Sequence, residues 1–164
     1  MSTPASNPQS TAARRSAEAT LRGLITRFAP SHVRLVGATR RNLQKRLPTA
    51  HEMVYEYRDC FVVSYSPSGK GYEGVLGVRG SAEGVRLYFN QGKPLPDPEK
   101  LLQGTGGQVR WIPLGSASAL ARPAVARLIA EALARNRVPF ALTGRGPLVL
   151  QSIKAKRARP TRAK

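Results

Sequence analysis

The sequence predicts an α+β fold with two N-terminal helices, a mostly antiparallel sheet of about five strands, and one C-terminal helix packed on the sheet. Three observations support this prediction. Apolar residues recur at helical spacing before residue 48 and again after residue 122. The stretch between them is rich in β-branched and aromatic residues. Short glycine-containing turns separate several of these β segments, which is typical of antiparallel neighbours.

The first helix is predicted to begin near Ser16 and to end before Pro30, because proline interrupts helical hydrogen bonding. Its apolar stripe consists of Leu21, Leu24, Ile25 and Phe28. Residues 1–15 lack such a period and are rich in Ser, Thr, Ala, Pro and Gln, so we expect them to be disordered. The folded domain is expected over residues 16–150, and a basic disordered tail over residues 151–164.

A second helix is predicted over residues 31–47, before Pro48. One of its faces is apolar, and the opposite face is basic. The basic face consists of Arg34, Arg41 and Lys45. Arg40 falls inside the apolar face, and two interpretations are open for it. Its side chain either extends along its own stem to solvent, or pairs with a carboxylate or a ligand in a pocket.

Five segments are predicted as strands, at residues 52–57, 60–66, 71–79, 84–90 and 108–114. Side chains alternate along a strand, so Glu52 and Glu56 are expected on the same side of the first segment. The second segment is mainly apolar on both sides, which indicates a central strand. The spacing and turns predict an antiparallel meander.

Two further helices are predicted after the fourth strand. Asp97 is expected to cap a short helix with Pro98 at its first position, carrying Leu101 and Leu102. The last helix begins at Pro123 and carries a clear apolar stripe. After that helix, the segment GRGPLVLQSI forms either a short strand or an extended arm.

Positive charge dominates the composition, with 27 Lys and Arg against nine Asp and Glu, a net charge of +18. Such a balance predicts attraction to polyanions, above all nucleic acid. The tail is the densest part, with the basic residues Lys154, Lys156, Arg157, Arg159, Arg162 and Lys164 and no acidic ones. A flexible polycation of this kind binds phosphates with little sequence readout, and the basic face of the second helix would extend it. The alternative is a tail that only keeps the protein soluble.

Several classes of protein are disfavoured by the sequence. Cys60 is the single cysteine, it begins an apolar run, and we expect a buried, inert thiol. No apolar signal segment or membrane span is present, so we expect a cytoplasmic protein that does not bind membranes. No catalytic or cofactor-binding motif is found, so we expect neither enzymatic activity nor a cofactor.

Two weaker sets of residues are candidates for small ligands or metals. All five tyrosines fall in the predicted sheet, where they either pack or line a ligand cleft. The candidate ligand-binding residues are Arg40, Tyr65, Lys93 and Arg110. The candidate metal ligands are Glu52, Glu56 and Glu73.

The run LPDP-x-x-LLQG-x-G lies at residues 95–106 and is followed by QVR. With this run as its most specific part, the chain resembles the YdhG-like family of bacterial domains of unknown function over roughly residues 20–160. The resemblance implies a compact α+β domain with an antiparallel sheet. Some members are described as frataxin-like iron chaperones, so the resemblance implies iron binding as an alternative function. Iron delivery needs an acidic surface, whereas the nine acidic residues here are scattered through a positively charged chain.

We therefore expect first a non-enzymatic protein that binds nucleic acid through its basic tail. A frataxin-like iron chaperone and a small-ligand-binding module are the two alternatives.

Overall fold

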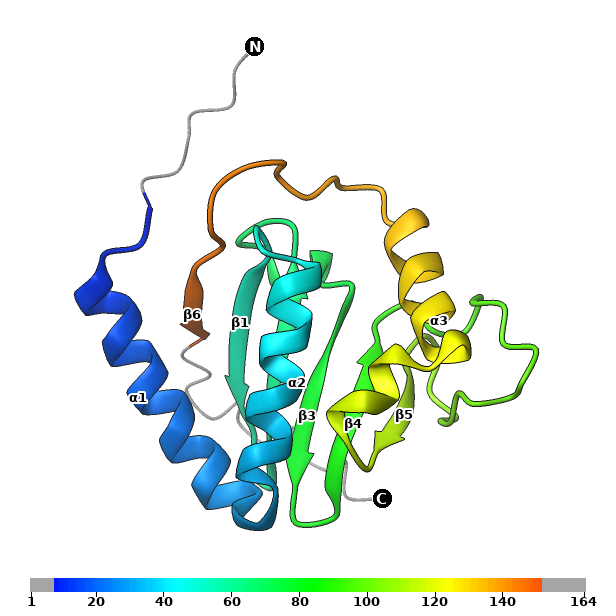
Figure 1. Ribbon diagram of the computed structural model, residues 1–164, viewed down its shortest axis with the longest axis horizontal. Helices are drawn as coiled ribbons and strands as arrows, with labels where there is room; N and C mark the ends of the chain where they lie inside the picture. The colour runs from blue at the N-terminus through cyan, green and yellow to red at the C-terminus, as the bar shows by residue number, and fades with distance from the viewer. Residues whose placement is uncertain (1–7, 152–164) are drawn as a thin grey trace, which may run out of the picture.

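Three α-helices lie on one side of a six-stranded sheet in the computed structural model, which describes residues 8–151 (Figure 1). This arrangement confirms the predicted α+β fold with a mostly antiparallel sheet. Within residues 8–151, no helix has both the length and the apolar character needed to cross a membrane.

The elements follow one another from α1 to β6. The α-helices are α1 (Thr11–Phe28), α2 (Val33–Arg46) and α3 (Pro123–Ala134). The strands are β1 (His51–Glu56), β2 (Cys60–Ser66), β3 (Leu76–Ser81), β4 (Gly84–Phe89), β5 (Arg110–Leu114) and β6 (Leu148–Gln151). Three short 3-10 helices are η1 (Pro30–His32), η2 (Gly71–Glu73) and η3 (Ala117–Ala121).

The strand order is β5-β4-β3-β2-β1-β6. Strands β1 to β5 form the expected antiparallel meander. Strand β6 returns after α3 and pairs with β1 in parallel, with Gln151 opposite Tyr55. Of the two alternatives for the segment GRGPLVLQSI, a short strand or an extended arm, the strand is therefore correct, and it forms one edge of the sheet.

Helix α1 begins at Thr11, earlier than the predicted start near Ser16. The side chain of Ser10 accepts a hydrogen bond of 3.1 Å from the backbone N–H of Ala13, which caps the helix. Residues 11–15, assigned to the disordered segment from the sequence, are therefore helical. The first turn is mostly exposed, so no apolar period marks it.

The short helix predicted after Asp97 is not formed, and the prediction was wrong. The Asp97 carboxylate does accept hydrogen bonds from the backbone N–H groups of Leu101 and Leu102, each at 2.9 Å. Lys100, however, has a φ of 54°, in the left-handed region, and this conformation cannot continue a right-handed helix. The carboxylate therefore caps a turn.

The hydrophobic core lies between the helices and one side of the sheet. Strand residues such as Val63, Val78 and Leu87 are buried there against the stripes of α1 and α3, which contribute Leu21 and Leu128. Because side chains alternate along each strand, the neighbouring residues point to the other side of the sheet. Figure 1 shows no α-helix of residues 8–151 on that second side, which we call the open side.

Candidate functional site

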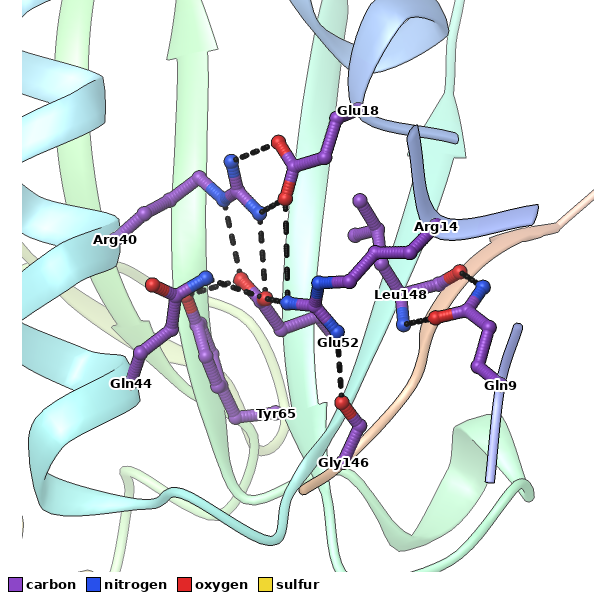
Figure 2. Close-up of polar contacts among 9 residues, drawn as sticks. All are labelled: Gln9, Arg14, Glu18, Arg40, Gln44, Glu52, Tyr65, Gly146 and Leu148. Carbon is purple, nitrogen blue, oxygen red and sulfur yellow. Dashed lines mark hydrogen bonds and ion pairs between the residues drawn. The ribbon is translucent and has the colours of Figure 1, made fainter. Parts of the chain in front are cut away.

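The carboxylate of Glu52 is the centre of a buried polar cluster between the helices and the sheet (Figure 2). Its side chain is only 3% exposed. Arg40 donates to it from Nε at 3.1 Å and from Nη2 at 3.2 Å. Gln44 donates at 2.7 Å, and the hydroxyl of Tyr65 donates at 2.9 Å. Both carboxylate oxygens are thus bound by protein donors.

Helix α1 supplies the rest of this cluster, as Figure 2 shows. Glu18 accepts two hydrogen bonds of 3.0 Å from the guanidinium of Arg40. Arg14 lies 3.5 Å from Glu52 and donates at 3.0 Å to the carbonyl of Gly146, just before β6. We call this group the Glu52 cluster; it consists of Arg14, Glu18, Arg40, Gln44, Glu52 and Tyr65. It joins both N-terminal helices to strands β1 and β2.

The charges inside the Glu52 cluster stabilise one another. Burial acts to lower the pKa of Arg40, but its bonds to Glu18 and Glu52 outweigh burial and raise that pKa. The hydrogen bond from Arg40 is the main cause that lowers the pKa of Glu18. Burial raises the pKa of Tyr65, so its hydroxyl stays a donor. The interpretation of Arg40 as a partner of carboxylates is confirmed.

The three candidate metal ligands do not converge. Glu52 is occupied by the cluster, Glu56 pairs with Arg27 at 2.8 Å, and Glu73 accepts a hydrogen bond from Ser68. In the part of the chain that the structure describes, no three His, Cys, Asp or Glu side chains are grouped to hold a metal ion. The expectation of a carboxylate site from these residues is corrected: Glu52 and Glu56 are each paired with arginine, and Glu73 is bonded to a serine hydroxyl away from both.

The four candidate ligand-binding residues do not form one cleft. Arg40 and Tyr65 belong to the buried cluster, whereas Lys93 is exposed. Arg110 donates to the carbonyls of Gly106 and Val109, at 2.6 and 2.8 Å. Two strands, β3 and β4, separate the strand of Tyr65 from that of Arg110. The prediction of a cleft at these positions was wrong.

The candidate nucleic-acid-binding residues fall into two groups. Arg34, Arg41 and Lys45 are exposed on α2, as the helical spacing predicts. The six basic residues of the tail, Lys154, Lys156, Arg157, Arg159, Arg162 and Lys164, lie outside the described residues. The first group therefore provides cations on the helical side of the domain.

A hollow of about 900 Å³ lies on the open side of the sheet. Strands β1 to β5 all contribute to it, because alternation directs their non-core residues to this side. Its principal side chains are Tyr55, Tyr72, Arg79, Arg86, Tyr88 and Trp111. We call it the open-face hollow. Its volume exceeds those of three other hollows on residues 8–151, which are about 490, 110 and 530 Å³.

Arginine is the main charged residue of the open-face hollow. Arg58, Arg79 and Arg86 line it, and Asp59 is the single acidic residue among its described lining. The guanidinium of Arg86 lies 3.7 Å from the ring centroid of Trp111, in a cation–π contact. Arg79 donates from Nε to the sulfur of Cys60 at 3.4 Å, and that thiol is buried as expected.

Two tyrosines of the hollow, Tyr55 and Tyr88, lie against glycine backbone and carry no charge near neutral pH. A Cβ atom at Gly77 would overlap the hydroxyl of Tyr88, and one at Gly71 would overlap that of Tyr55. Glycine at both positions thus makes room for the rings. Burial is the main cause that raises the pKa of Tyr55 and of Tyr88, so both phenols stay protonated.

Sequence reasoning did not single out the arginines and the tryptophan of the hollow. The signal was present as alternation: Arg79 follows Val78, Arg86 precedes Leu87, and Trp111 precedes Ile112. In each pair, the apolar residue belongs to the core. A strand-by-strand assignment of sides would have placed the three polar or amphipathic residues together.

Comparison with known proteins finds no matching family model, no matching curated protein and no matching solved structure. The resemblance to the YdhG-like family therefore stays a prediction.

The Glu52 cluster predicts a large loss of stability on replacement of Arg40. In Arg40→Met, Glu52 stays buried without its main cation, and we expect the free energy of unfolding to fall by about 3–5 kcal/mol. Urea denaturation measures this change. Arg41→Met is the matched control, because Arg41 is exposed on the same helix, and it should change stability by less than about 0.5 kcal/mol. Equal effects of the two substitutions would contradict the structural role of the cluster.

The lowered pKa of Glu18 predicts a specific dependence of stability on pH. Glu18 stabilises the fold above its ordinary pKa of 4.5, and this contribution is lost as pH falls through the lower pKa of the folded state. We therefore expect Glu18→Gln to lower Tm near neutral pH and the difference from wild type to shrink in acid. Thermal melts from about pH 7 to about pH 3 test this.

Glu99→Gln provides the control for that pH series, since Glu99 is exposed and forms no ion pair with another described residue. Its Tm should follow that of the wild type across the range. A constant difference between Glu18→Gln and wild type at every pH would show that Glu18 acts by packing and not by charge.

Proposed function

We propose that this is a non-enzymatic nucleic-acid-binding protein. The observation that carries the proposal is uncompensated positive charge. Of the 27 Lys and Arg in the chain, six lie in residues 152–164, so residues 8–151 hold 21 against nine Asp and Glu, a net charge of +12. The folded part and the tail therefore both attract polyphosphates.

Local pairing removes much of the negative charge from the surface. Five of the nine acidic side chains form ion pairs with arginine: Glu18, Glu52, Glu56, Glu83 and Glu131. By contrast, Arg34, Arg41 and Lys45 are exposed and form no ion pair with another described residue. The field outside the domain is thus positive, which speeds the approach of an anionic polymer.

The described surface favours nucleic acid over a membrane. Helices that bind membranes expose an apolar face, whereas α1, α2 and α3 bury theirs in the core. The open-face hollow instead combines arginine with aromatic rings, which are the side chains that bind phosphates and bases. The thiol of Cys60 in this hollow accepts a hydrogen bond from Arg79, and no described side chain that could act as a general base is hydrogen-bonded to it. This arrangement supports binding over catalysis.

The basic tail supplies the electrostatic part of the proposed binding. Its six cations follow Gln151, the last residue of β6, which pairs with Tyr55 beside the hollow. Contacts from such residues to phosphates release counterions and carry little sequence information. The affinity is therefore expected to fall steeply with salt.

The tail predicts a salt dependence that truncation removes. If its six cations contact phosphates, they contribute about −5 to the slope of log K against log salt. A chain that ends at Gln151 should show a slope shallower by about that amount. Fluorescence anisotropy of a labelled oligonucleotide, measured between about 50 and 200 mM salt, tests this.

A tail with the same residues in scrambled order is the matched control, and it should keep the full slope because charge and not sequence is read. A tail of equal length with glutamine at each cationic position should behave like the truncation. An unchanged slope after truncation would refute the role of the tail. Absence of binding to any oligonucleotide at low salt would refute the proposed function.

A further inference from the structure

The open-face hollow presents aromatic rings at two of its walls. At the end of β1, the ring of Tyr55 and that of Tyr57, the residue after the strand, lie with centroids 6.4 Å apart and planes 25° from parallel. On β4 and β5, Tyr88 and Trp111 line the opposite part of the same hollow. Tyr57 is 46% exposed, so its ring is open to a partner. Flat rings of this kind are surfaces on which nucleobases stack.

Two arginines lie side by side between these walls. Arg79 on β3 and Arg86 on β4 are directly opposite each other in the sheet. Like charges at directly opposed positions destabilise a sheet, so this pair opposes folding unless an anion relieves it. Arg86 has a partial counter-charge in Glu83 at 3.3 Å, whereas Arg79 forms no ion pair with another described residue. The floor of the hollow therefore favours an anionic group.

The size and openness of the hollow fit single-stranded nucleic acid better than a duplex. Its volume of about 900 Å³ is near the upper end of ordinary ligand pockets, about 300–1,000 Å³. A duplex hides the faces of its bases inside the stack, so they cannot reach the rings. A single strand offers base faces and phosphates together, which matches rings at the walls and arginines on the floor.

We infer that the open-face hollow binds unpaired nucleotides of single-stranded nucleic acid, with one base on Tyr57, a second against the stacked side chains of Arg86 and Trp111, and a phosphate at Arg79. This inference rests on the proposed function and names the form of nucleic acid that the domain selects. Self-association through the same surface is disfavoured, because it would bring the paired arginines of two copies together. The tail adds affinity for any form, and the hollow adds the preference for unpaired bases.

Trp111 is the single tryptophan of the chain, so its emission reports directly on the hollow. Titration of the full chain with a strand of about ten nucleotides should change this emission to saturation. The same strand annealed to its complement should bind, as anisotropy shows, but leave Trp111 emission nearly unchanged. A mononucleotide should act only at about 100-fold higher concentration. A mononucleotide as effective as the strand would overturn the assignment to single strands.

Substitutions test the two contacts separately. Arg79→Gln should weaken single-strand binding about tenfold, while Tm stays equal or rises because the like-charge pair is relieved. Arg127→Gln is the matched control, since Arg127 is exposed on α3 and equally basic, and it should weaken binding much less. Tyr57→Ala should also lower the affinity for a single strand about tenfold. Tyr57→Phe, which keeps the ring, should bind with the affinity of the wild type.

The outcomes separate this inference from the proposed function. The inference is overturned, while nucleic-acid binding stands, if three results are found together. Single-stranded and duplex nucleic acid bind with equal affinity, Trp111 emission does not respond to either, and Arg79→Gln weakens binding no more than Arg127→Gln does. If no oligonucleotide binds at low salt, both fall. If Trp111 emission instead depends on protein concentration without nucleic acid, the hollow is an interface between copies and the inference is overturned.

Discussion

The buried carboxylate of Glu52 sets the arrangement of this fold. A charge that is removed from water costs several kcal/mol unless hydrogen bonds and an opposite charge replace the solvent. Here Arg40 on α2 and Arg14 on α1 replace the solvent around Glu52. Glu18 accepts two further hydrogen bonds from Arg40. Both helices must therefore dock at fixed positions on the same side of the sheet. No α-helix of the described residues covers the other side, where the open-face hollow lies.

The two sides of the sheet use arginine in opposite ways. On the helical side, arginines and carboxylates alternate in a closed and nearly neutral network, which specifies packing. On the open side, Arg79 and Arg86 oppose each other without equal negative charge. A cost of this kind, on a surface that also gathers aromatic rings, is typical of a binding site and not of a core. Stability and the proposed binding would thus be carried by different faces of the same strands.

The order of helices and strands was predictable because it depends on local periodicity. The stripe around Leu21 and the alternation in β2 are examples, and the unusual place of Arg40 in an apolar face was also visible. Its partners were not predictable, because they lie 12 and 22 residues away and only the tertiary fold brings them together. The prediction of a short helix after Asp97 was wrong for a different reason. A single left-handed residue, Lys100, overrides favourable capping, and no local pattern announces it.

Strand β6 is held more firmly than its length suggests. Gln9 exchanges two hydrogen bonds with the backbone of Leu148, at 2.8 and 3.0 Å, and a Cβ atom at Gly146 would overlap the carbonyl of Ala50. The end of β6 is consequently anchored beside Tyr55 of β1. If the tail and the open-face hollow both bind nucleic acid, the two weak sites would reinforce each other, because only a few residues join them and binding at one raises the effective concentration at the other to about the millimolar range. Modest affinity at each site would then add up to durable retention on a long strand.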